Sequence, residues 1–76
     1  MRIVVAGAGR LGYSIAALLS EENMDVVVVD GEESQLEAAK ATLDVLTIAA
    51  NIASPLTMND PDINGADILI AVTESD

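Results

Sequence analysis

The stretch that decides the fold is Ile3-Val4-Val5-Ala6-Gly7-Ala8-Gly9-Arg10-Leu11-Gly12. Its first four residues are apolar, and three of them are β-branched. Such a run without polar alternation is typical of a strand buried on both faces of a parallel sheet. A complete G-x-G-x-x-G follows at once and leads into residues with helical spacing. A strand, a glycine loop and a helix in this order form the dinucleotide-binding fingerprint.

Each glycine of the motif has its own role in this fingerprint. Gly7 allows the tight turn out of the strand, Gly9 removes a side chain that would block a pyrophosphate, and Gly12 lets the helix pack close to the sheet. The helix directs its unpaired N–H groups and positive dipole end at the phosphates. Three glycines alone could also make no more than a compact turn, so the neighbouring elements decide between the two interpretations.

A second strand and an acidic residue complete the pattern. Val26–Val29 are four β-branched residues in a row, and Asp30 follows them, eighteen positions after Gly12. An acidic side chain at this place accepts hydrogen bonds from the ribose of an adenine dinucleotide. A 2′-phosphate would meet this carboxylate with no Arg or Lys nearby. The sequence therefore favours NAD(H), or an adenine nucleotide with a free ribose, over NADP(H).

The rest of the chain alternates helices and strands. We expect a first helix from Arg10 to about Glu22, ended by Asn23. Its apolar stripe is expected at Leu11, Ile15, Leu18 and Leu19. The further expected elements are a helix from Glu32 to about Leu43, a strand at Val45–Ala49, a short helix from Ser54 to about Met58, turns at Asn59–Pro61 and Asn64–Gly65, and a doubly buried strand at Ile68–Val72. With right-handed crossovers, this order predicts an α/β fold: a Rossmann-like parallel sheet flanked by helices, of strand order 3-2-1-4.

Composition excludes several classes of function. The chain has 76 residues, enough for one small domain, and a net charge of -10. Its acidity and its single aromatic residue, Tyr13, argue against nucleic acid as a partner. It has no Cys and no His, which excludes thiol and imidazole catalysis and the usual zinc sites. The apolar runs are too short to span a membrane, so we expect a cytoplasmic protein with no direct membrane insertion.

Three polar residues near the motif each allow two interpretations. Arg10 would lie against the phosphates, or else be a solvated arginine paired with a glutamate. Asn51 follows the third expected strand, where it would neighbour the adenine or cap its own loop. Thr73 follows the fourth expected strand near the topological switch point, where it would reach the pyrophosphate and second ribose or cap a following helix.

The glycine motif, Val29-Asp30 and the segment from Ala66 to Asp76 together resemble the N-terminal nucleotide-binding domain of Trk-type potassium-uptake regulators, the RCK, KTN or TrkA-N domain. The resemblance implies a non-enzymatic, cytosolic domain that binds NAD(H) or ATP/ADP and controls a membrane potassium transporter through the full-length protein. In that family the contacts fall on the glycine loop, on the acid after the second strand and on the stretch matching Thr73-Glu74. The candidate cofactor-binding residues are thus Gly7, Ala8, Gly9, Arg10, Leu11, Gly12, Asp30, Asn51, Thr73 and Glu74.

Two departures from the family pattern stand out. Family members usually carry Gly followed by Asp or His after the third strand, where this chain has Ala50-Asn51. Such domains also continue through two more strands, so residues 1–76 are expected to be a partial domain, truncated after the fourth strand. That strand would then be an unprotected edge, which predicts a homodimer or higher oligomer.

Other functions fit parts of the same pattern. The main alternative is the N-terminal dinucleotide-binding half of an NAD-dependent dehydrogenase. A methyltransferase would usually carry G-x-G-x-G, so Gly12 argues against it. A scaffold with a vestigial nucleotide site is the remaining alternative.

Overall fold

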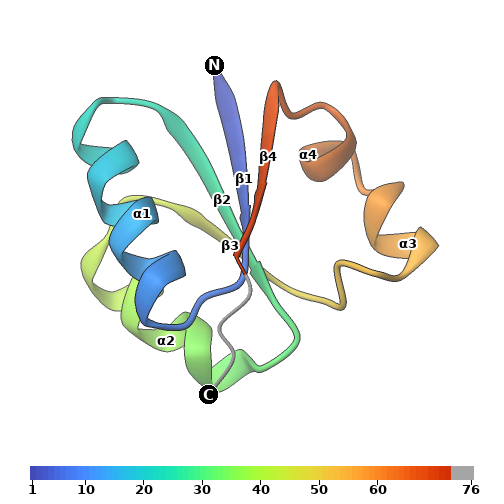
Figure 1. The fold of residues 1–76 in the computed structure, drawn as a ribbon, viewed down its shortest axis with the longest axis horizontal. Coiled ribbons are helices and arrows are strands. Elements are labelled where there is room, and N and C mark those ends of the chain that lie inside the picture. The colour runs from blue at the N-terminus through green and yellow to red at the C-terminus, as the bar shows by residue number, and fades with distance from the viewer. Residues whose placement is uncertain (73–76) are drawn as a thin grey trace.

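Four parallel strands form one sheet in the order β3-β2-β1-β4 (Figure 1). The structure is a computed structural model, and it describes residues 1–72. The strands are β1 (Arg2–Ala6), β2 (Asp25–Asp30), β3 (Leu46–Ala49) and β4 (Ile68–Ala71). The register pairs Val4 with Val27 on one side and with Leu69 on the other. The predicted fold class and strand order are confirmed.

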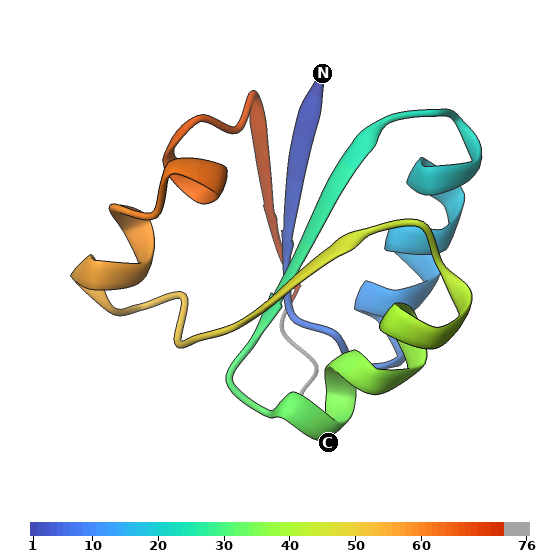
Figure 2. The ribbon, with the colours of Figure 1, turned by 180° about the vertical axis from the view of Figure 1, so that it is seen from behind.

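Helices cover both faces of this sheet. The longer pair, α1 (Arg10–Glu21) and α2 (Glu33–Thr42), lies on one face. The single-turn helices α3 (Pro55–Met58) and α4 (Pro61–Asn64) lie on the other (Figure 2). No helix in the described part of the chain is both long and apolar enough to cross a membrane.

The core is built on β1 and β2, because these strands have neighbours on both sides. Their valines are buried and alternate between the two faces: Val5 and Val28 pack towards α1 and α2, and Val4 and Val27 pack towards α4. The prediction that β4 is buried on both faces was wrong. Ile68 and Leu69 are 42% and 46% exposed, because β4 pairs only with β1 within residues 1–72.

The predicted apolar stripe of α1 was also partly wrong. Ile15 and Leu19 pack against the core, but Leu11 and Leu18 are exposed. The buried positions are the small residues Gly12 and Ala16. A Cβ on Gly12 would collide with the carbonyl oxygen of Gly7, because the helix lies in close contact with the glycine loop. The face of α1 that carries these small residues is therefore the one that packs against the sheet.

The segment between β3 and β4 contains one helix more than expected. The short helix expected here is α3, and Ser54 caps it, since its hydroxyl accepts the N–H of Leu56 at 3.3 Å. The two predicted turns, however, flank the helical turn α4. Asp60 accepts the N–H of Asp62 at 2.9 Å, Pro61 occupies the first turn, and Ile63 is buried under the sheet. This second cap was overlooked because its segment reads as a turn.

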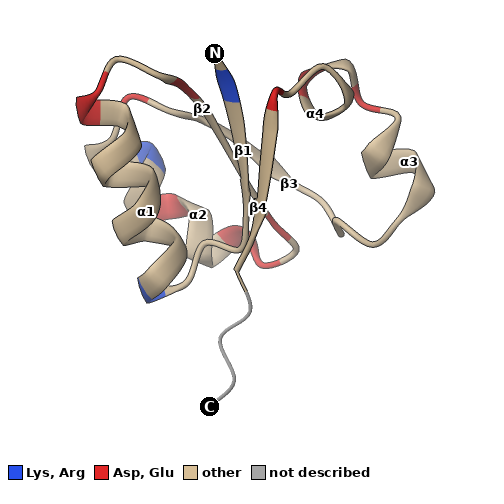
Figure 3. Ribbon diagram, turned by 45° about the horizontal axis from the view of Figure 1, so that its top comes forward, with Lys and Arg blue, Asp and Glu red and all other residues tan. Residues whose placement is uncertain are grey.

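Arg2 joins four elements at the amino ends of the strands. Its guanidinium group forms ion pairs with Asp25 at 2.8 Å and Asp62 at 2.9 Å, and its backbone N–H donates to Asp67 at 2.8 Å. The hydrogen bond and charge of Asp25 raise the pKa of Arg2. The three basic residues of the chain lie on β1, α1 and α2, well separated from one another (Figure 3). They therefore make no basic patch.

Candidate functional site

Gly7 makes the turn by which the chain leaves β1 and enters the glycine loop. It has a φ of 120°, in the region that favours glycine, and its N–H donates to the carbonyl oxygen of Val29 at 2.7 Å. A Cβ there would lie 2.5 Å from the carbonyl oxygen of Val72. Gly7 thus allows the tight turn out of β1, which is the role that the fingerprint predicts for it.

Gly9 is the N-cap residue of α1 and has no side chain with which to cap this helix. Its φ of -68° is accessible to any residue, so backbone conformation does not require glycine here. The first turn of α1 also contains no acidic residue. Because the first N–H groups of a helix need acceptors from outside it, this end of α1 can receive an anion.

Asp30 connects the glycine loop to the segment that follows β2. One carboxylate oxygen accepts the N–H of Ala8 at 2.8 Å, and the other accepts the N–H of Glu32 at 2.8 Å. A carboxylate has about four acceptor positions, so two remain for further donors. The sequence indicated a role for Asp30 towards a ligand but not this role within the protein.

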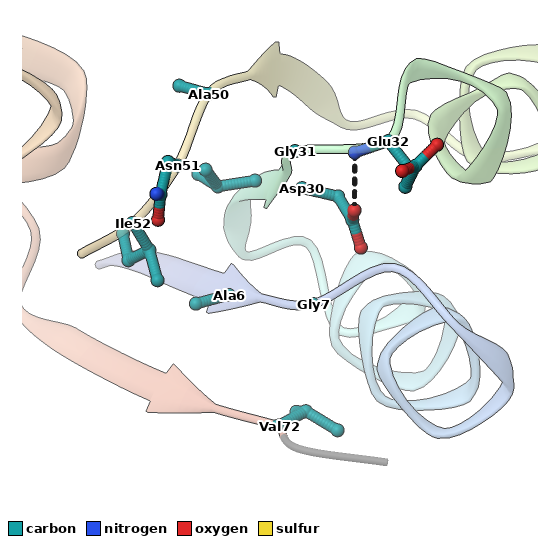
Figure 4. A pocket seen from close by; sticks show the side chains of 10 residues that line it. Ala6, Gly7, Asp30, Gly31, Glu32, Ala50, Asn51, Ile52 and Val72 are labelled. Atoms are coloured by element: carbon teal, nitrogen blue, oxygen red, sulfur yellow. Dashed lines mark hydrogen bonds between the residues drawn. The ribbon is translucent and has the colours of Figure 1, made fainter. Parts of the chain in front are cut away.

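A cleft of about 380 Å³ lies beside Asp30 at the carboxyl ends of the strands (Figure 4). Its lining residues are Ala6, Gly7, Val29, Asp30, Gly31, Glu32, Ala50, Asn51, Ile52 and Val72. This volume is in the range of small-molecule sites, and open parallel sheets bind their ligands at this end. The described lining includes two carboxylates and no basic residue.

Comparison with known proteins identifies the family. Residues 3–76 match the model of the TrkA-N domain. The chain belongs to the TrkA-N domain family. Three similar curated proteins are Trk system potassium uptake protein TrkA of Halomonas elongata (36% identical) and the TrkA homologs of Archaeoglobus fulgidus (40%) and Methanothermobacter thermautotrophicus (34%). All of this chain is aligned in each case, but it spans only 17%, 17% and 35% of the three relatives.

Membership confirms the resemblance drawn from the glycine motif, Asp30 and the last segment. TrkA-N domains are Rossmann-like nucleotide-binding domains, and the relatives are named as parts of potassium uptake systems. Nucleotide binding is therefore the general property that this fold carries.

The TrkA-N structure brings some of the candidate residues together and separates others. Gly7, Asp30 and Asn51 line the cleft. Ala8 bonds to Asp30 behind it, and Gly12 packs against the loop. Thr73 and Glu74 lie outside the described residues.

Arg10 and Leu11 are exposed at the start of α1. With Ala8 and Gly9, Arg10 lines a second hollow of about 330 Å³ between α1 and α2. Arg10 forms no ion pair with any residue from 1 to 72, so the expected glutamate partner is not found there.

Asn51 has the predicted loop-capping role and also lines the cleft. Its side-chain oxygen accepts the N–H of Ala53 at 2.9 Å, which caps the loop, while the residue also lines the cleft. Sequence reasoning missed Gly31, Glu32 and Ile52 as lining residues. The sequence feature that could have indicated these three residues is that they come shortly after the ends of β2 and β3.

Proposed function

We propose that this TrkA-N domain is a regulatory module that binds an adenine nucleotide, NAD(H) in the first place and ATP or ADP as the alternative, in a Trk-type potassium uptake system. The observation that carries the proposal is the Asp30 carboxylate, held between the glycine loop and the cleft with acceptor positions left over. Family membership supports it.

The phosphates would lie at the start of α1. Gly9, the N-cap residue of α1, presents backbone without a side chain, and the positive end of the helix dipole favours an anion there. Arg10, which has no ion-pair partner within the described chain, supplies a positive charge next to this position. Ala8, Leu11, Thr73 and Glu74 complete the proposed contacts to the phosphate groups and the second ribose.

The ribose and the adenine would occupy the cleft. Asp30 accepts the ribose hydroxyls, and the base lies near Asn51 and Ile52. A 2′-phosphate would enter between Asp30 and Glu32, and charge repulsion disfavours it. This arrangement supports NAD(H) over NADP(H).

Regulation would operate by a shift in conformation. The composition offers no Cys or His for chemistry, and a binding module needs none. The relatives are named for potassium uptake, so we propose a membrane potassium transporter subunit as the partner of the full-length protein, which would lie at the inner face of the membrane. Pairing of the exposed edge of β4 would give a homodimer or higher oligomer.

Thermal unfolding followed by circular dichroism tests nucleotide binding. NADH, ATP or ADP at a hundredfold excess over Kd should add about 2.7 kcal/mol, or about 10–20 °C in Tm. NADPH should add less. Asp30→Ala should abolish most of this ligand-dependent shift, measured against its own ligand-free Tm.

The matched control is Asp44→Ala, an exposed acidic residue outside the cleft, which should keep the full shift. If no adenine nucleotide raises the Tm of the unchanged protein, the proposal is wrong. Hydride transfer from NADH by the full-length protein would instead support the dehydrogenase alternative.

A further inference from the structure

The fold gives no reason for a glycine at position 31. Its φ lies outside the left-handed region, the residue is exposed, and a Cβ built on it would meet no described atom within 4 Å. Gly7 and Gly12, by contrast, would collide with the backbone if they carried a side chain. A glycine that the backbone does not need only increases the conformational freedom of the unfolded chain.

Position 31 lies on the rim of the cleft. It directly follows Asp30, and the backbone carbonyl of Asp30 accepts the N–H of Ala50 at 3.1 Å. The ends of β2 and β3 are therefore joined one residue before Gly31, and from there the chain continues through Gly31 and Glu32 on one side and through Asn51 and Ile52 on the other (Figure 4). Gly31 and Ala50 are both small, and both line the cleft.

We propose that Gly31 is a specificity-determining residue whose missing side chain keeps open the space for the sugar and base of the bound nucleotide. This inference rests on the proposed nucleotide-binding function. Asp30 and Glu32 flank Gly31 in sequence, and both line the cleft. The open space admits uncharged sugar and base atoms and repels a phosphate attached at the same place.

The test compares Gly31→Ala and Gly31→Val with the unchanged protein by calorimetric titration of ADP and NADH. Gly31→Val should raise both Kd values about tenfold or more, and Gly31→Ala should raise them less, because the added atoms occupy ligand space. The Tm of the ligand-free variants should stay equal or rise. The Kd for inorganic pyrophosphate, which has neither sugar nor base, should not change.

The control variant is Ala41→Val, on an exposed position of α2 outside the cleft, which should bind ADP and NADH normally. If the unchanged protein binds ADP and Gly31→Val binds it equally well, the inference is overturned and the proposed function stands. If Gly31→Val raises the Kd for pyrophosphate to the same degree, or lowers the ligand-free Tm, then glycine is required for the backbone conformation at this position. The inference is again overturned in that case. An unchanged protein that binds neither nucleotide overturns both proposals.

Discussion

The Asp30 side chain has a structural role within the protein as well as the proposed role towards a ligand, and the sequence indicates only the second. Its carboxylate accepts N–H groups from the glycine loop and from the start of the β2–α2 connection, so it fixes the relative position of two segments that are distant in sequence. Both bonds join a charged acceptor to a backbone donor, which makes them stronger than neutral hydrogen bonds. The same atoms that would meet a ribose therefore also shape the site within the protein.

Asp30→Asn should consequently destabilise the protein even without ligand. An amide has one acceptor oxygen, so its NH₂ group would face either the Ala8 or the Glu32 N–H. Because Ala8 is buried, we expect the free energy of unfolding in urea to fall by about 1–2 kcal/mol. Asp44→Asn, on an exposed residue, should change it by less than about 0.5 kcal/mol. Equal stability of Asp30→Asn and the unchanged protein would show that the two bonds contribute little.

Among the elements, α1 has two contrasting ends. Its N-cap residue is Gly9, which has no side chain, whereas its end is closed by a hydrogen-bonded motif: the N–H of Asn23 donates to Ser20 at 3.3 Å, and the N–H of Met24 donates to Leu19 at 3.4 Å. Asn23 has a φ of 60°, the left-handed conformation that this motif requires. The end of α1 at Asn23 is thus fixed by backbone hydrogen bonds, whereas its start is formed by the glycine loop.

The left-handed conformation of Asn23 gives a prediction for α1. Asn23→Ala should lower the free energy of unfolding by about 1 kcal/mol, because alanine tolerates this region less well than asparagine. Asn23→Gly should leave it equal or slightly higher. Denaturant titration of the two variants provides the measurement. A loss of similar size in both would point to the asparagine side chain instead of its backbone conformation.

Signals close together in sequence predicted most of these elements correctly. The valine run of β2, the Ser54 cap and the stop at Asn23 are read within a few residues. The errors concern contacts across the fold. The rotation of α1 depends on how closely Gly12 approaches Gly7, and the bond from Ala8 to Asp30 spans 22 positions. The same limit applies to the site: the motif indicated Gly7 and Asp30, but only the assembled sheet brings Ile52 to the same cleft.

The whole molecule is asymmetric about its sheet. Two long helices cover one face, while two single turns cover the other and leave Leu46 on β3 and Leu69 on β4 nearly half exposed. Because β1 and β2 are covered on both faces, the exposed large apolar side chains of the sheet lie on its edge strands β3 and β4. An exposed apolar edge strand is a ready surface for pairing with another chain.

A charge placed on β4 should therefore reduce self-association. The proposed oligomer of the unchanged protein should dissociate on dilution in analytical ultracentrifugation, and Leu69→Lys should be a monomer at every concentration. The control Leu56→Lys changes a leucine on α3 that is 83% exposed, away from β4, and should associate like the unchanged protein. A monomer at all concentrations without any substitution would contradict the proposed pairing.

Tyr13 has a further consequence for how this molecule can be studied. Its hydroxyl lies 2.6 Å from that of Thr42, so the phenol bridges α1 and α2 one position after the glycine motif. It is also the sole aromatic side chain of the protein. The near-ultraviolet emission of the protein therefore comes from one chromophore at the junction of these two helices. A ligand that moves α1 relative to α2 would change that emission, and no label would be needed to follow it.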